Sequence, residues 1–286
     1  MTEPIIVGTD GSAPADRAVR WAADEAARRD RPLHIVHTEE RWPYDIPLYP
    51  VPGERISLTE MGRGVLVAAE KLAREQRPDL HVTTELVAQP TVTALCERST
   101  EAFEIVLGHR GLGGFTAMLL GSVGLRTAEH SSAPVVIVRG EPASDHREVA
   151  VGVDLTEGSS ALAYAFETAA VRGARLRVVH AWQVPDRLLE HGGRLELKQL
   201  EEQLRWKVIE AHAPYRKLFP EVEVVEELPQ DHPVAALEQI SREVDLVVVG
   251  AHDRKALPSL RLGSTSHGIV HHAHCPVAIT RQTTTS

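Results

Sequence analysis

The stretch IIVGTDGSAPADRAVRWAADEAARR, residues 5–29, passes from an apolar run through a short polar turn into a helical pattern. Residues 4–9 are rich in isoleucine and valine, which is typical of a strand buried on both faces of a parallel sheet. Residues 13–29 carry an apolar stripe at helical spacing, and Ser12 precedes them as a candidate N-cap. A strand that leads directly into a helix is the building unit of an α/β fold.

The same alternation of strand and helix continues along the first half of the chain. The further elements predicted there are strands at 33–37, 82–87, 104–108 and 135–138 and helices at 57–76 and 91–100. The strand candidates are rich in valine, isoleucine and leucine, as expected for strands that helices cover on both faces. The pattern predicts a five-stranded, parallel, doubly wound sheet with right-handed crossovers.

The second half of the chain repeats the first. The matching segments are IIVGTD (5–10) and VAVGVD (149–154), LHIVHT (33–38) and LRVVHA (176–181), FEIVLGHRG (103–111) and VDLVVVGAHD (244–253), and SAPVVIVR (132–139) and HCPVAITR (274–281). Matching residues stay 142 to 144 positions apart, a period far longer than that of solenoid repeats. The chain is therefore predicted to hold two copies of one domain, residues 1–143 and 144–286. The second copy has a long charged helix near 188–217.

Composition narrows the class of protein. The 286 residues are 43% hydrophobic and 25% charged, which is ordinary for a globular protein with real cores. The net charge of −9, with basic residues scattered among acids, argues against nucleic acid or an anionic membrane surface as partner. No apolar run approaches the ~20 residues that span a bilayer, and no signal peptide is recognised. The two cysteines match no metal or redox spacing, so a reduced, cytoplasmic setting is expected.

The segment GHRGLGGFTAMLLGSV, residues 108–123, is unusually rich in glycine. It leaves the carboxyl end of the fourth predicted strand and enters a helix that is expected to begin near Ser122. Free N–H groups at a helix start attract anions, and glycines let backbone N–H groups approach a phosphate unhindered. Ser122 is expected to cap this helix or to bond a phosphate oxygen. The segment is a flexible loop on one interpretation and a phosphate cradle on the other.

Two familiar phosphate-binding motifs do not fit this segment. The chain contains no G-x-x-x-x-G-K-[ST], and GLGGF lacks the G-x-G-x-x-G spacing and follows the fourth strand instead of the first. The spacing that does occur is Gly108, two residues, Gly111, nine residues, then Gly121 and Ser122. This G-x2-G-x9-G-[ST] pattern resembles the ATP-binding signature of the universal stress protein family. The opening VGTDGS, the A-x-x-W-A-A that follows it and the closing HHAHCPVAI extend the resemblance, so the chain looks like a tandem, two-domain member.

The resemblance implies two Rossmann-like domains of the adenine nucleotide alpha hydrolase-like type, each with strand order 3-2-1-4-5. This order puts the topological switch between the first and fourth strands and brings Asp10 beside the loop after Gly108. It implies that ATP binds there, with Asp10 near the ribose or near Mg²⁺ held through the nucleotide. The positions carried over for nucleotide binding are Asp10, Val36, Val87, Ala88, Gly108, Gly111, Gly113, Gly121, Ser122 and Val123.

The resemblance also implies an assembly. Fifth strands of this family commonly pair across a dimer. VVIV (135–138) and VAIT (277–280) are therefore expected to pair within this chain as an intrachain, pseudo-twofold dimer. Whether two such chains form a homodimer is left open. The sequence does not identify a protein partner.

The second copy departs from the pattern. Its candidate nucleotide-binding residues are Asp154, Val179, Gly250, Gly263, Ser264 and Thr265. Asp253 stands where the first copy has Gly111, and its carboxylate would repel an anion unless Arg254, Lys255 or Arg261 compensates. Nucleotide binding by the second copy is left open. The interior glycines are particular to the first copy, which makes that copy the better candidate site.

Three other features have a structural and a functional interpretation. The segment RWPYDIPLYPVPG (41–53) has no counterpart in the second copy and is either a surface loop or a lid or partner surface built from Trp42, Tyr44 and Tyr49. His37 and His180 follow the second strand of each copy, where a repeated structural role is favoured over catalysis. His267 and His271 are spaced for a metal on a helix, but an ordinary helix-to-strand junction is favoured.

These observations leave three classes of function. The leading one is an ATP-binding regulator of stress response or growth arrest, acting through nucleotide-dependent conformation or partner binding, as the resemblance implies. The second is an enzyme, at most a slow ATP hydrolase, because no general base other than Asp10 is evident beside the loop. The third is a scaffold whose repeats pair and bind nothing.

Overall fold

The computed structural model describes residues 2–39, 58–111, 121–140, 145–155, 160–184, 194–251 and 262–281. The chain divides into two compact units, Met1–Val138 and Arg139–Ser286. The boundary predicted between residues 143 and 144 and the proline-rich loop 41–53 lie outside the described residues. Of the helices within those ranges, none is long and apolar enough to cross a membrane.

The first unit has the elements expected from the sequence, with ends that agree to within two residues. They are β1 (Ile5–Gly8), α1 (Ala13–Arg28), β2 (Leu33–Thr38), α2 (Leu58–Gln76), β3 (Val82–Val87), α3 (Thr91–Arg98), β4 (Glu104–Gly108), α4 (Ser122–His130) and β5 (Val135–Val138).

The second unit repeats this order. Its elements are β6 (Glu148–Gly152), α5 (Ser160–Arg172), β7 (Arg175–Val179), α7 (Arg194–Leu218), β8 (Val224–Glu227), α8 (Pro233–Ile240), β9 (Leu246–Gly250), α9 (Ser264–His272) and β10 (Val277–Thr280). The helix α7 is the long charged helix that was expected near 188–217.

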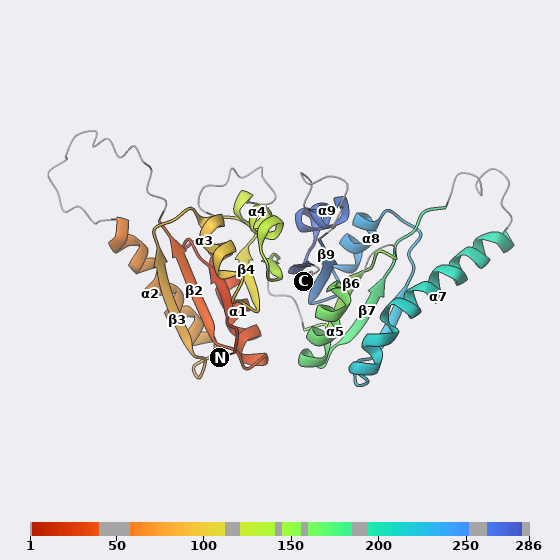
Figure 1. The fold of residues 1–286 in the computed structure, drawn as a ribbon, viewed down its shortest axis with the longest axis horizontal. Helices are drawn as coiled ribbons and strands as arrows, with labels where there is room; N and C mark the ends of the chain where they lie inside the picture. Colours follow the sequence, from red (N-terminus) through yellow and green to blue (C-terminus); the bar gives the residue numbers. More distant parts are fainter. Residues whose placement is uncertain are drawn as a thin grey trace. The chain divides into compact units, whose positions relative to one another are not determined.

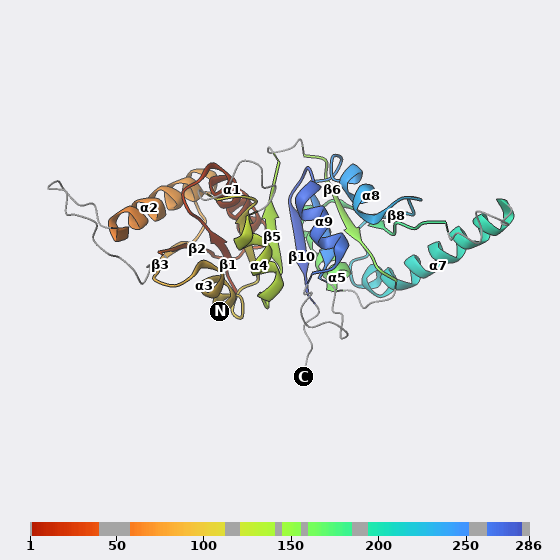
Figure 2. The same cartoon turned by 90° about the horizontal axis from the view of Figure 1, so that it is seen from above.

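Each unit is a parallel sheet between two layers of helices (Figure 1). The strand order is β3-β2-β1-β4-β5 in the first unit and β8-β7-β6-β9-β10 in the second, which is the predicted 3-2-1-4-5. Figure 2 shows α1 and α2 on one side of the first sheet and α3 and α4 on the other. The chain adds β2 and β3 on one side of β1 and β4 and β5 on the other, so the carboxyl ends of β1 and β4 lie at the topological switch. The pseudo-twofold relation of the two units stays a prediction.

The core explains why the strands read as continuous apolar runs. The residues Ile5, Val7, Ile105 and Val136 are fully buried because helices cover both faces of these strands. The predicted N-cap of α1 is confirmed. Ser12 has extended backbone dihedrals, and its Oγ accepts a hydrogen bond from the N–H of Ala15 at 3.4 Å.

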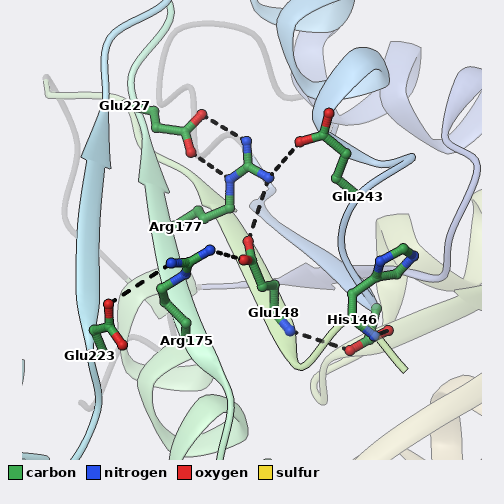
Figure 3. Close-up of polar contacts among 8 residues, drawn as sticks. His146, Glu148, Arg175, Arg177, Glu223, Glu227 and Glu243 are labelled. Atoms are coloured by element: carbon green, nitrogen blue, oxygen red, sulfur yellow. Dashed lines mark hydrogen bonds and ion pairs between the residues drawn. The ribbon is translucent and has the colours of Figure 1, made fainter. Parts of the chain in front are cut away.

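The amino ends of the strands in the second unit carry a network of ion pairs (Figure 3). Arg177 binds Glu227, Glu243 at 3.0 Å and Glu148 at 3.5 Å, and Arg175 pairs with Glu148 as well. Burial alone would lower the pKa of Arg177, but hydrogen bonds to Glu227 and Glu243 outweigh it, so the pKa is raised. The network joins the amino ends of β6 and β7 to Glu227, the last residue of β8.

Candidate functional site

The carboxyl ends of β1 and β4 bring Asp10 and Gly111 together. A Cβ atom built on Gly111 would stand 2.4 Å from Oδ2 of Asp10, so the backbone of Gly111 lies directly against the carboxylate. These two residues are 101 positions apart in the sequence. Only the sheet order joins them, because β4 pairs with β1. The contact lies at the crevice where open α/β sheets bind their ligands.

The turn after β1 holds the Asp10 side chain in place. Its Oδ1 accepts a hydrogen bond from the N–H of Ser12 at 3.0 Å, and Oγ1 of Thr9 accepts one from the N–H of Gly11 at 3.2 Å. Gly11 has a φ of +76°, a conformation that side-chain-bearing residues rarely adopt. The sequence G-S after Asp10 therefore makes the turn that directs one carboxylate oxygen toward its own backbone.

Gly108 is required by packing. A Cβ on this residue would stand 2.7 Å from the carbonyl carbon and oxygen of Pro14, at the start of α1. At its counterpart in the second unit, Gly250, none of the residues that the structure describes lies within 4 Å of a Cβ. Within the described residues, the structure thus shows a steric need for glycine at position 108.

The helix α4 begins at Ser122, as expected, but Ser122 does not cap it. The N-cap is Gly121, with φ −73° and ψ 147°, and it offers no side chain to the first-turn N–H groups. Ser122 is the first helical residue and is exposed, and Val123 follows it. The prediction that Ser122 caps α4 is wrong because Gly121 already has the extended conformation of an N-cap. The cap leaves the first-turn N–H groups without a side-chain acceptor from that residue.

The residues expected near adenine lie at the ends of β2 and β3. The backbone carbonyl of Val36 accepts from the N–H of Thr9 at 3.0 Å, and that of Val87 accepts from the N–H of Glu39 at 2.9 Å. Val36 and Val87 are buried, whereas Ala88 is exposed. The two carbonyl groups therefore already have partners within the sheet.

Sequence reasoning missed Thr38, the last residue of β2. Alternate residues of a strand direct their backbone groups to the same neighbour, and Val36 directs its carbonyl toward β1. Thr38 therefore directs its N–H and C=O past the end of β1, into the switch-point crevice. Its Oγ1 meets that of Thr91 at 2.7 Å, which ties β2 to α3. A backbone contact leaves no side-chain signature, so only the ladder register could have found this residue.

The equivalent residues of the second unit have a similar backbone arrangement. Val179 accepts from the N–H of Val153 at 2.9 Å, as Val36 does from Thr9, and Asp154 follows as an exposed residue. Gly263 is the N-cap of α9 and offers no side-chain cap. Ser264 and Thr265 are the first two residues of that helix. Gly113 in the first unit and Asp253 in the second lie outside the described residues.

The two strand-end histidines have the same structural bond. Nδ1 of His37 donates to the carbonyl of Thr9 at 2.7 Å, and Nδ1 of His180 donates to that of Val153 at 3.0 Å. Because a carbonyl only accepts, Nδ1 carries the proton in both rings. Each histidine thus fixes the turn after the first strand of its unit.

The late histidines form a ring contact. The rings of His267 and His271 lie 4.9 Å apart between centroids, and burial lowers the pKa of His271, helped by its neighbours His267 and Arg139. Across the described ranges, no group of three or more histidine, cysteine or carboxylate side chains is arranged to hold a metal ion. A cavity of about 1300 Å³ opens elsewhere, at the amino ends of β2 and β3, beside Arg31, His34 and Arg77. It lies at the edge of the sheet opposite Asp10, so we do not identify it with the candidate site.

Comparison with known proteins gives the family. The model of the universal stress protein family matches residues 1–139 and 146–281. A universal stress protein of Mycobacterium tuberculosis is 34% identical over 287 residues, covering 97% of this chain and 97% of its own. The chain belongs to the universal stress protein family and carries two family domains in tandem.

Solved structures agree on the fold. A universal stress protein from Archaeoglobus fulgidus superimposes with a TM-score of 0.67 at 17% identity, covering 100% of this chain and 98% of its own. A universal stress protein solved in complex with cAMP is 28% identical, covers 48% of this chain and 97% of its own, and has a TM-score of 0.38.

Proposed function

We propose that the first unit binds ATP at the carboxyl ends of β1 and β4 and that the protein acts as a nucleotide-responsive regulator. The observation that carries this proposal is the contact between Asp10 and Gly111 at the topological switch, beside the start of α4. This arrangement suits a metal-bound phosphate. The carboxylate would bind the metal, and the helix start would attract the phosphate.

The start of α4 supplies the attraction for phosphate. Its first-turn N–H groups have no side-chain cap from Gly121, and the helix dipole adds partial positive charge there. Among the residues that the structure describes, the atom nearest to a Cβ on Gly121 would be the carbonyl oxygen of His109, at 3.7 Å. A phosphate oxygen at this place would accept hydrogen bonds that the protein itself does not satisfy through the cap.

The base is proposed to lie at the end of β2. Thr38 offers a backbone donor and acceptor side by side toward the crevice, and adenine offers an amino donor next to a ring nitrogen acceptor. Both partners of such a pair are matched, so adenine would fit with two hydrogen bonds. Ala88 is exposed nearby at the end of β3 and would contact the base without blocking it.

Asp10 is the residue suited to Mg²⁺. Its Oδ1 accepts from Ser12, and a carboxylate oxygen is the kind of ligand that Mg²⁺ takes alongside substrate phosphates. The metal would enter with the nucleotide, since one carboxylate and phosphate oxygens suffice for it. Asp10→Ala should therefore weaken ATP binding more in the presence of Mg²⁺ than in EDTA, and equal effects would count against the metal role.

The second unit is proposed to bind nucleotide weakly or not at all. It keeps Gly263 and the start of α9, but the sequence has Asp253 in place of Gly111. A carboxylate there repels a polyphosphate. Nucleotide would thus bind to the first unit only. A conformational change of that unit on binding would alter how the chain interacts with partners that regulate the stress response or growth arrest.

The test is the nucleotide that the purified protein retains, identified by mass spectrometry after denaturation. We expect adenine nucleotide with the wild-type chain and none with Gly121→Glu, because this substitution puts a side chain and a negative charge at the phosphate position. No described residue lies closer than 3.7 Å to a Cβ at Gly121, so the variant is expected to fold. Gly263→Glu is the matched control, which makes the same change at the N-cap of α9 and should retain the nucleotide. Absence of nucleotide from the wild-type chain, together with no ATP uptake, would overturn the proposal.

A further inference from the structure

Arg110 lies in the segment that joins β4 to the contact with Asp10. It directly precedes Gly111, which meets Asp10, and it follows Gly108, which ends β4, by two residues. A Cβ on Gly121 would stand 3.8 Å from the Cα of Arg110, so the arginine backbone passes beside the N-cap of α4. The N–H of Gly121 also donates to the carbonyl of His109 at 2.9 Å, which fixes this approach.

One nitrogen of the Arg110 guanidinium, Nε, lacks a hydrogen bond within the described part of the chain. Its Nε is buried and has no hydrogen-bond partner among the residues that the structure describes. A buried N–H donor without an acceptor costs free energy, and native proteins rarely leave one in place without a reason. An arginine keeps its charge at any ordinary pH, so this nitrogen stays a charged donor.

From this juxtaposition we propose that Arg110 binds the outer phosphates of the nucleotide and makes the site prefer ATP to AMP. The inference rests on the proposed function of the first unit. The planar guanidinium presents five donors in a fork that matches two phosphate oxygens, and such bonds are charge-assisted. The α-phosphate would lie nearer the base and be held by other backbone groups, so AMP would gain little from Arg110.

The negative charge of Asp10 and of a bound polyphosphate favours a cationic side chain at this site. Asp10 places a carboxylate against Gly111, and a polyphosphate brought to the same crevice would be repelled by it. Mg²⁺ and one fixed cation together offset this repulsion, whereas the helix start alone carries only partial charge. In the second copy the residue at the position of Arg110 is His252, which supplies no permanent charge. The absence of an arginine at this position agrees with the weak or absent nucleotide binding that we propose for the second unit.

The experiment measures the affinities of ATP, ADP and AMP, each with Mg²⁺, by titration calorimetry of the full chain. The variants are Arg110→Gln, Arg110→Lys and the matched control Arg126→Gln, which removes one charge from an exposed residue of α4. We expect Arg110→Gln to weaken ATP by about tenfold to a hundredfold and AMP by less than about threefold. Arg110→Lys should fall between, because lysine keeps the charge and loses the fork.

The outcomes separate the two proposals. If the wild-type chain binds no adenine nucleotide, the proposed function and the role of Arg110 both fail. If it binds ATP and Arg110→Gln changes ATP and AMP equally, the proposed function stands and the role of Arg110 is wrong. The same loss in Arg126→Gln would reduce Arg110 to a general charge effect and overturn the proposal as well. Thermal unfolding of each variant shows that it is folded, and Arg110→Lys carries the test if Arg110→Gln is not.

Discussion

Gly111 lies against the carboxylate of Asp10, so closely that a Cβ on residue 111 would stand 2.4 Å from Oδ2. The contact joins the ends of two strands that pair only because the fourth strand crosses back beside the first. It explains why the first copy has glycine here, and why aspartate at the same position of the second copy is a change of chemistry.

The first prediction concerns this contact. Gly111→Ala should weaken ATP binding by about tenfold while it lowers the free energy of unfolding by less than about 1 kcal/mol. The reason is that the crowded atom is a side-chain oxygen and not backbone, so Asp10 would turn aside at small cost and lose the position that its bond with Ser12 gives it. Titration calorimetry and urea unfolding measure the two effects. Gly64→Ala is the control, since nothing lies within 4 Å of a Cβ there; an equal loss of affinity in that variant would refute the role of the contact.

The second prediction compares two equivalent glycines. Gly108→Ala should destabilise the chain by about 1–3 kcal/mol, because its Cβ would meet the backbone of Pro14 at 2.7 Å and the start of α1 must move. Gly250→Ala should be neutral or stabilise by up to about 1 kcal/mol, because its Cβ meets no described residue within 4 Å and its φ is ordinary. Urea unfolding of both variants tests this, and equal destabilisation would contradict the packing argument.

The third prediction concerns acid stability of the first unit. Hydrogen bonds from Arg98 lower the pKa of Glu85 to about 2, against the opposing effect of burial, with His34 also contributing. A carboxylate whose pKa is lowered by folding stabilises the folded state above its unfolded pKa, and the effect is lost as pH falls from about 5 to 2. Arg98→Gln should therefore reduce stability at pH 7 by less than about 1 kcal/mol, since the Glu85 side chain is 40% exposed.

The stability difference between Arg98→Gln and wild type should shrink as pH falls toward 2. Urea midpoints at pH 7 and pH 3 measure it, and the carboxyl carbon of Glu85 followed by NMR reports the pKa directly. Arg74→Gln, at an exposed helical pair with Glu70, is the control. A difference that stays the same at both pH values would show that Arg98 acts without titration of Glu85.

The fourth prediction concerns the two cysteines. Burial raises the pKa of the Cys275 thiol to about 12, and its side chain is nearly inaccessible. In Cys96→Ser, Cys275 should therefore resist iodoacetamide at pH 8 until the protein is unfolded. Cys96, half-buried on α3, should be the thiol that reacts in the native wild-type chain. Rapid alkylation of native Cys96→Ser would contradict the buried environment of Cys275.

The fold could be read from the sequence because local and global signals agree. Apolar runs, helical stripes and the repeat in register predicted the strands and helices of both units, including the Ser12 cap. The strand order came from the resemblance to a family, since no local pattern says which strands pair. Of the two roles expected for Ser122, cap of α4 or ligand of a phosphate oxygen, the first falls to Gly121, because a glycine and a serine at a helix start are hard to rank without backbone dihedrals.

The site could be predicted only where side chains carry it. Asp10 and the glycines are visible in the sequence, and the structure brings Asp10, Gly108, Gly111 and Gly121 to one edge of the sheet. Thr38 offers only backbone groups, and the buried Nε of Arg110 depends on how the loop packs. Both follow from tertiary structure, which composition and spacing do not contain.

The stoichiometry of ATP binding by titration calorimetry tests the central claim most directly. The wild-type chain is predicted to bind one ATP, Gly263→Glu to keep that site, and Gly121→Glu to lose it with at least about a hundredfold weaker affinity. Binding that survives Gly121→Glu and disappears in Gly263→Glu, or no binding by the wild-type chain, would contradict the assignment of the nucleotide to the first unit.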